Sequence, residues 1–317
     1  MARHPVPGFR EGASSGQGSE APSSFARGLI VSLRPQQWTK NLVVFAALLF
    51  GRQLANPLAV ELAVAAFLVF CALSGTVYLV NDVADRESDR RHPLKRDRPI
   101  ARGVVSPAAA LAAAALIGAT ALVAAFWVGR TFGIVAVTYL VLLGLYSGPI
   151  KHAVILDVLT ISLGFVLRAV GGAVAIGVPI SHWLLVCTIL LALFLALSKR
   201  RHELVLLAED AASHRRILQE YSPYLLDQMI AVVTASTLMG YALYTVSPET
   251  IEKFGSDRLL LTFPFPIYGI FRYLYLVHQK QGGGSPAEML FNDRPLLACV
   301  ALWAVAVVLI IYQPVSF

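Results

Sequence analysis

The chain is 317 residues long; 57% of its residues are hydrophobic, only 14% are charged, and its mean hydropathy is +0.67. Soluble domains carry about a quarter charged residues, so this composition excludes a soluble globular domain and indicates an integral membrane protein. The formal net charge is +7. Cytoplasmic membrane surfaces attract such a surplus because their lipids are anionic. We therefore predict a lipid bilayer, and no nucleic acid, as the partner of the basic surface.

The predicted elements begin with a tail. Residues 1–28 are rich in Gly, Ser and Pro and have no apolar core behind a basic start, which predicts a disordered cytoplasmic tail rather than a signal peptide. Residues 29–317 form one all-α membrane domain, with helical runs long enough to cross about 30 Å of hydrocarbon. The nine predicted spans are 30–51, 59–81, 107–128, 131–149, 154–176, 182–198, 227–246, 259–278 and 295–313.

The basic residues predict the orientation of these spans. If the N-terminus is cytoplasmic, the inside segments hold 20 Lys and Arg, and the outside segments hold four. Cytoplasmic loops carry such an excess, so we expect a multi-pass plasma-membrane protein with an extracytoplasmic C-terminus and an active site that faces the cytoplasm. The sequence leaves open whether the chain forms a homo-oligomer.

A row of oxygen-bearing side chains ends the second span. Asn81, Asp85 and Asp89 recur at i, i+4 and i+8, so on a helix they share one face, with Asp82 and Tyr78 beside them. Like charges in a row repel unless a cation lies among them, and hard oxygen ligands suit Mg²⁺ that is shared with substrate phosphates. We therefore predict that Asn81, Asp82, Asp85 and Asp89 bind Mg²⁺, with Asp82 and Asp85 acting catalytically. The alternative is a solvated helix end paired to the next arginines: Arg86, Arg90 and Arg91.

Cations follow this row at once. Lys and Arg can hold the phosphate oxygens that a metal leaves uncovered. We expect Lys95, Arg98 and Arg102 to bind substrate phosphates, whereas the other basic residues of the segment can face lipid headgroups.

Residues 81–89, NDVADRESD, resemble the NDxxDxxxD signature of the UbiA superfamily of intramembrane prenyltransferases. The resemblance covers nearly all of the chain after residue 30 and implies a nine-helix bundle with a cavity open to the cytoplasm and to lipid. In the second signature of the superfamily, Tyr146, Lys151 and Asp157 fit, but Ile161 stands where a second Asp is expected.

Three further stretches are similar to one branch, the decaprenyl-phosphate phosphoribosyltransferases: residues 34–41, 156–172 and 197–203. The resemblance implies phosphoribosyl diphosphate as donor, a polyprenyl (decaprenyl) phosphate as acceptor, and a product that serves arabinan synthesis in a cell envelope. Arg200, in the third of these stretches, joins the expected substrate-binding residues, as do Tyr78 and Asn81 at the end of the second span and Tyr146 of the second signature.

Two ionisable residues lie within a predicted span. Asp157 and Arg168 are eleven residues apart, three helical turns plus about 20°, so they face the same way. Ionisable groups inside membranes are functional candidates, and we expect Asp157 to be catalytic and Arg168 to bind a phosphate. A structural Asp–Arg strut between helices is the alternative.

Three lysines stand at the expected cytoplasmic ends of different helices: Lys40, Lys151 and Lys199. Together with Lys95, Arg102 and Arg168 they are enough to surround a phosphorylated pentose and a lipid phosphate. Lys199 is also placed for an ordinary i, i+4 pair with Glu203.

Two other functions fit parts of this pattern. An aromatic prenyltransferase of the quinone or haem pathways would share the fold, the metal motif and the topology. A transporter would instead use Asp157 and Arg168 as an intramembrane gate. The chain length of the prenyl group and the number of metal ions are left open by the sequence.

Overall fold

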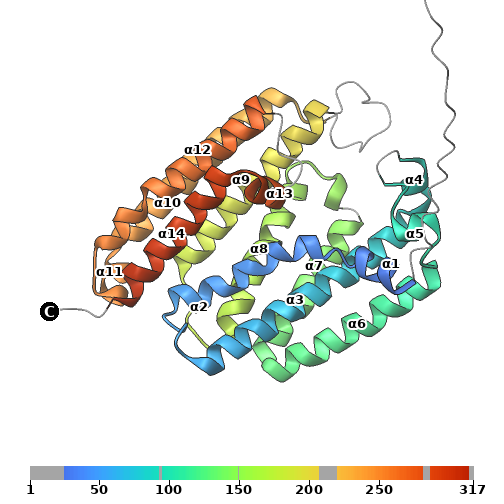
Figure 1. The fold of residues 1–317 in the computed structure, drawn as a ribbon, viewed down its shortest axis with the longest axis horizontal. Coiled ribbons are helices and arrows are strands. Elements are labelled where there is room, and N and C mark those ends of the chain that lie inside the picture. Colours follow the sequence, from blue (N-terminus) through green and yellow to red (C-terminus); the bar gives the residue numbers. More distant parts are fainter. Residues whose placement is uncertain (1–24, 93–94, 149, 207–219, 281–285, 314–317) are drawn as a thin grey trace, which may run out of the picture.

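The computed structural model describes residues 25–92, 95–148, 150–206, 220–280 and 286–313, which form a bundle of helices (Figure 1). No strand occurs within these ranges. The elements are α1 (Phe25–Ser32), the 3₁₀ segment η1 (Pro35–Phe45), α2 (Ala46–Phe50), α3 (Pro57–Ala84), α4 (Arg86–Arg91), α5 (Pro99–Arg102), α6 (Pro107–Val128), α7 (Arg130–Ser147), η2 (Ile150–His152), α8 (Leu156–Ala175), α9 (His182–Leu206), α10 (Pro223–Val246), α11 (Pro248–Phe254), η5 (Arg258–Thr262), α12 (Pro264–Gln279), α13 (Pro286–Asn292) and α14 (Arg294–Tyr312).

Within the described ranges, eight helices are long and apolar enough to cross a membrane. They coincide with the last eight predicted spans to within a few residues, apart from the C-terminal end of α9, which runs on to Leu206. The chain is therefore a multi-pass membrane protein, whereas its orientation stays a prediction.

The first predicted span, 30–51, is not one continuous helix. It is divided among α1, η1 and α2, and α1 already begins at Phe25, inside the segment predicted to be a tail. The break follows Arg34, whose φ of 53° and ψ of 63° are left-handed. The next residue is Pro35, which disfavours the α conformation of the residue before it and cannot donate a backbone hydrogen bond. The predicted count of nine spanning helices therefore does not hold for continuous helices.

Local sequence signals explain where several helices begin. In α3, α6 and α10 a polar N-cap accepts a hydrogen bond from the backbone three residues on, and Pro occupies the first helical position. The segment Asn292 to Pro295 also begins a helix, because the Asp293 carboxylate accepts from the amide of Leu296 over 2.9 Å.

The helices form two packed groups. Around Phe70, α3 packs with α6, α7 and α8, and around Phe194, α9 packs with α10 and α12. Helix α8 contacts α9 and so joins the two groups, while η1 lies along α8. In Figure 1, α10, α12 and α14 run side by side on the orange and red side of the bundle.

The contact between α8 and η1 depends on Gly172. A Cβ atom at this position would overlap the backbone carbonyl of Val44 in η1. Only glycine therefore allows the two backbones to approach this closely, and the approach fixes the segment that carries Lys40 and Asn41.

We predict that Gly172→Ala lowers the free energy of unfolding by about 1–3 kcal/mol, because the added methyl group pushes η1 away from α8. Gly144→Ala on α7 is the matched control, since an added Cβ there meets nothing within 4 Å; the gain in helix propensity should stabilise it by about 0.5–1 kcal/mol. Thermal unfolding in detergent or nanodiscs measures both. Equal melting temperatures for the two variants would contradict the close approach.

Candidate active site

A cavity of about 1090 Å³ lies between the two groups of helices. Part of its wall is polar, and the remainder is lined mostly by apolar and aromatic side chains. The predicted oxygen-bearing residues that line it are Tyr78, Asn81, Asp82, Asp85 and Tyr146. The predicted cations that line it are Lys40, Lys95, Arg98, Arg168, Lys199 and Arg200.

Four predicted site residues do not line the cavity. Asp89 and Asp157 are 2% and 0% exposed, and Arg102 is exposed at the end of α5. Lys151 lies beside Asp85, with 4.0 Å between its Nζ and the Asp85 Oδ1. A carboxylate fully enclosed by protein cannot touch a substrate, so the position of Asp157 does not support a directly catalytic role. Arg102 and Lys151 likewise lie outside the wall that a ligand would contact.

The acid row (Asn81, Asp82, Asp85 and Asp89) does not form one continuous helical face. Helix α3 ends at Ala84 and α4 begins at Arg86, with Asp85 at the junction. Asn81, Asp82 and Asp85 line the cavity, whereas Asp89 is buried and does not. Asp82 and Asp89 share one partner. The Arg98 Nη1 lies 3.1 Å from Asp82 Oδ1 and 2.6 Å from Asp89 Oδ2.

A second arginine, which is not among the site residues predicted from the sequence, completes this contact. The Arg34 Nη2 lies 2.5 Å from Asp82 Oδ1, and its guanidinium stacks 4.7 Å from the centre of the Tyr78 ring. Arg34 also lines the cavity. The only indication of Arg34 in the sequence was that it belongs to the stretch 34–41, directly before Pro35. That it pairs with Asp82 on α3 is visible only in the folded structure.

Two of the three arginines expected to neutralise the row in the solvated-end alternative have other partners. Arg86 and Arg90 both pair with Glu87, and the Arg90 Nε donates to the carbonyl of Ala101 over 2.9 Å. These contacts join α4 to α5. The carboxylates of the row are instead neutralised by residues from more distant parts of the chain.

Arg168 lies inside the bundle and is only 6% exposed. Its Nε donates to Asn41 Oδ1 over 2.6 Å, its Nη1 to the carbonyl of Gly164 over 2.9 Å, and its Nη2 to the Tyr139 hydroxyl over 2.5 Å. Tyr139 in turn bonds Ser74 over 2.9 Å. All of these partners are neutral, so the network orients the guanidinium and leaves its charge available to an anion in the cavity.

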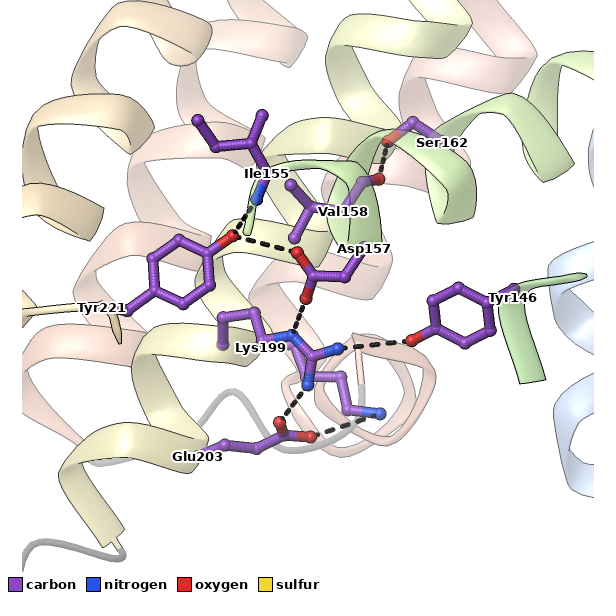
Figure 2. Close-up of polar contacts among 9 residues, drawn as sticks. Tyr146, Ile155, Asp157, Val158, Ser162, Lys199, Glu203 and Tyr221 are labelled. Carbon is purple, nitrogen blue, oxygen red and sulfur yellow. Dashed lines mark hydrogen bonds and ion pairs between the residues drawn. The ribbon is translucent and has the colours of Figure 1, made fainter. Parts of the chain in front are cut away.

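Asp157 and Arg168 do not pair with each other, and the Asp–Arg strut that does link two helices joins Asp157 on α8 to Arg200 on α9. Asp157 Oδ2 instead accepts from the Arg200 Nε over 2.8 Å, and Asp157 Oδ1 accepts from the Tyr221 hydroxyl over 2.9 Å. Figure 2 shows these contacts and those of Glu203, which accepts from the Arg200 Nη1 over 2.7 Å. Although positions 157 and 168 share a helix face, the neighbouring elements decide which partners their side chains meet.

Lys199 forms the expected pair with Glu203, with 3.7 Å between Nζ and Oε1 (Figure 2). The ordinary i, i+4 interpretation is therefore confirmed. Lys199 also lines the cavity, so the pair does not remove it from the candidate site. Tyr146 contributes from α7, where its hydroxyl accepts from the Arg200 Nη2 over 3.3 Å.

The oxygen atoms of the acid row are of the type that Mg²⁺ binds. Among the described residues, no group of three or more His, Cys, Asp or Glu side chains is gathered closely enough to hold a metal ion alone. Asp85 has a side chain that is 46% exposed and lines the cavity with Asn81. Since Mg²⁺ usually keeps several waters and shares phosphate oxygens, this donor set fits a metal ion that binds together with a phosphate.

These features match a known class of membrane enzyme. The chain belongs to the UbiA prenyltransferase family, whose sequence model matches residues 42–293. The fold agrees with this membership: a UbiA homolog from Archaeoglobus fulgidus, bound to GPP and Mg²⁺, superposes with a TM-score of 0.69 at 18% identity, over 90% of this chain and all of that one.

Within the family, the chain is similar to proteins named decaprenyl-phosphate phosphoribosyltransferase. That of Mycolicibacterium smegmatis is 34% identical over 296 residues, which cover 89% of this chain and 92% of that protein. That of Mycobacterium tuberculosis strain H37Rv is 32% identical over 295 residues, covering 91% and 96%. The UbiA assignment made from the acid row is therefore confirmed.

We predict that Arg168→Lys keeps the fold but weakens the binding of inorganic diphosphate, added with Mg²⁺, at least about tenfold. Lysine keeps the charge but cannot bond Asn41, Gly164 and Tyr139 while also presenting a planar fork to phosphate, and a hydrogen bond between charged groups is worth about 1.5–3 kcal/mol. Isothermal titration calorimetry measures the affinity.

The control for this substitution is Arg258→Lys, at an exposed position of η5. It should leave both diphosphate affinity and melting temperature unchanged. An Arg168→Lys protein with normal affinity, or one whose loss of affinity is matched by unfolding, would contradict the assignment of Arg168 to an anion site.

Proposed function

We propose that this protein transfers 5-phosphoribose from phosphoribosyl diphosphate to a polyprenyl phosphate, decaprenyl phosphate in the simplest case, and releases diphosphate. The observation that carries the proposal is the number of cations that line the cavity, among which Arg168 has only neutral hydrogen-bond partners in the part of the chain that the structure describes. The names of the similar mycobacterial proteins support the same reaction.

The second signature favours this reaction over prenyl transfer to an aromatic ring. Ile161, at the position of the expected second Asp, lines the cavity. An apolar side chain there cannot bind a metal ion on an allylic diphosphate. A phosphorylated pentose with a diphosphate, facing a lipid phosphate, brings three phosphate-bearing groups and so makes use of the many cations.

The chemistry needs little acid–base catalysis. An oxygen of the lipid phosphate, already ionised at neutral pH, attacks C1 of the ribose while the bond from C1 to the diphosphate oxygen breaks. The configuration at C1 is inverted through an oxocarbenium-like ribose. The task of the protein is to hold both substrates in line and to stabilise the leaving diphosphate with fixed positive charges, which we assign to Lys40, Arg98 and Arg168.

The acid row would hold Mg²⁺ through Asp82, Asp85 and Asn81, with Asp89 acting on Asp82 through their common partner Arg98. Mg²⁺ bound there would supply charge neutralisation to the departing diphosphate. Asp85 is the ligand of first choice, because its carboxylate is half exposed and its side chain lines the cavity.

The apolar part of the cavity wall would receive the first isoprene units of the acceptor. Phe50, Leu191 and Trp303 contribute to this part. We place the site at the cytoplasmic face of the plasma membrane, where a soluble phosphorylated sugar is available. The product would then serve arabinan synthesis in the cell wall.

The purified protein in nanodiscs should transfer radiolabelled phosphoribose to decaprenyl phosphate, and EDTA should abolish the transfer. EDTA removes Mg²⁺, and the cations of the protein alone neutralise only part of the negative charge on the diphosphate of the donor. Thin-layer chromatography of the lipid fraction measures the product. Transfer of a prenyl group to 4-hydroxybenzoate, with none of phosphoribose, would instead identify an aromatic prenyltransferase.

Asp85→Ala should lower the rate of transfer by about tenfold to a thousandfold, the cost of one lost electrostatic contact at the leaving group, and added Mg²⁺ should restore part of it. Asp97→Ala, an exposed acidic residue of the next loop, is the matched control and should transfer normally. Steady-state rates at several Mg²⁺ concentrations measure the effect. An Asp85→Ala protein with full activity and an unchanged Mg²⁺ requirement would exclude the metal site.

A further inference from the structure

Helix α8 is preceded by a strained turn. Ile155 has a φ of 69° and a ψ of −43°, a conformation that β-branched residues rarely adopt. The amide of Leu156 donates to the carbonyl of Val154 over 2.8 Å, and this i to i+2 hydrogen bond defines a γ-turn of the rare positive-φ form. Strained backbone of this kind persists only where surrounding contacts hold it.

Tyr221 supplies that contact from a distant part of the chain, immediately before α10. Its hydroxyl accepts from the amide of Ile155 over 2.7 Å and donates to Asp157 Oδ1 over 2.9 Å (Figure 2). The residue is only 4% exposed. Burial raises the pKa of Tyr221 to about 12, so its hydroxyl stays protonated and can donate throughout the neutral pH range.

Asp157 connects Tyr221 to Arg200, because its carboxylate accepts hydrogen bonds from both side chains. Three N–H groups of the guanidinium are fixed by Asp157, Glu203 and Tyr146. Within the part of the chain that the structure describes, the other two have no protein acceptor. Arg200 lines the cavity, although it is only 3% exposed, so its remaining donors can serve a ligand there.

We propose that Tyr221 is a positioning residue for the transfer reaction: it holds the first turn of α8 and, through Asp157, sets the orientation of Arg200 toward the phosphoribosyl donor. The identity of that donor rests on the function proposed above. Tyr221 does not line the cavity and does not touch substrate. Its effect should therefore fall on donor binding and leave the lipid acceptor unaffected.

Tyr221→Phe tests the proposal. It removes both hydrogen bonds of the hydroxyl, so it should raise the KM for phosphoribosyl diphosphate about tenfold and leave the KM for decaprenyl phosphate within about twofold, as expected for the loss of a hydrogen bond to a charged group. A residue with a merely structural role would lower the amount of active protein and leave both KM values unchanged.

Tyr312→Phe is the matched control. The Tyr312 hydroxyl also accepts from a backbone amide, that of Leu54 over 3.0 Å. Tyr312 is the last residue of α14, and its other described partners are the carbonyls of Leu48 and Leu49, so it takes no part in the network around Arg200. Both variants should lose similar thermal stability, while only Tyr221→Phe changes the donor KM. A donor KM that is normal in Tyr221→Phe, or that changes equally in both variants, overturns the proposal.

A second substitution separates the turn from the rest of the network. Glycine adopts positive φ without strain, so Ile155→Gly in the Tyr221→Phe background should recover part of the lost donor affinity. Recovery supports the strained turn as the link between Tyr221 and Arg200, and a further loss of affinity overturns it.

Inorganic diphosphate, titrated with Mg²⁺ into the full-length protein, separates failure of this inference from failure of the proposed function. If the wild type transfers phosphoribose but Tyr221→Phe binds diphosphate and donor normally, only the positioning role fails. If the wild type transfers none while Tyr221→Phe still weakens diphosphate binding relative to Tyr312→Phe, the proposed reaction fails and the positioning role stands.

Discussion

A guanidinium group inside a bundle of apolar helices must find hydrogen-bond acceptors, because an unpaired buried charge costs several kcal/mol. This protein meets the constraint in two ways. Arg34, Arg98 and Arg200 are paired with carboxylates. Arg168 is held by an amide, a carbonyl and a phenol, which orient it without neutralising it. Among these four arginines, three therefore have part of their charge neutralised by carboxylates, whereas the charge of Arg168 is left in full for an anionic ligand.

The same constraint explains how distant segments come together at the cavity. Asp82 brings the end of α1 and the loop before α5 onto α3, through Arg34 and Arg98. Asp157 brings α9 and the start of α10 onto α8. Each buried carboxylate therefore assembles a wall from several elements, and both substrates of the proposed reaction would meet between the two walls. In such a site the acid row can be divided between α3 and α4 at Asp85, since no single helix has to supply all of the residues that would bind the substrates and the metal ion.

Much of the fold follows from the sequence because apolar runs report helices directly; eight spans were found in this way. Within the acid row, the contacts of Asn81, Asp82 and Asp85 with the cavity also follow from their spacing at the end of α3. The pairing of Asp157 could not be predicted, since a shared helix face does not say which neighbour packs against it. Asn41, Tyr139 and Tyr221 were missed for a related reason: they are uncharged, and only the tertiary fold brings their polar atoms to an ionic side chain.

The most direct measurement of the central claim is an experimental structure of the full-length protein in lipid, with phosphoribosyl diphosphate and Mg²⁺. We expect the phosphate groups to lie in the cavity, with one of them bound by Arg168, and Asp85 to be among the residues that hold Mg²⁺. Donor bound outside the cavity, or Arg168 contacting only Asn41, Gly164 and Tyr139 in the occupied state, would contradict it.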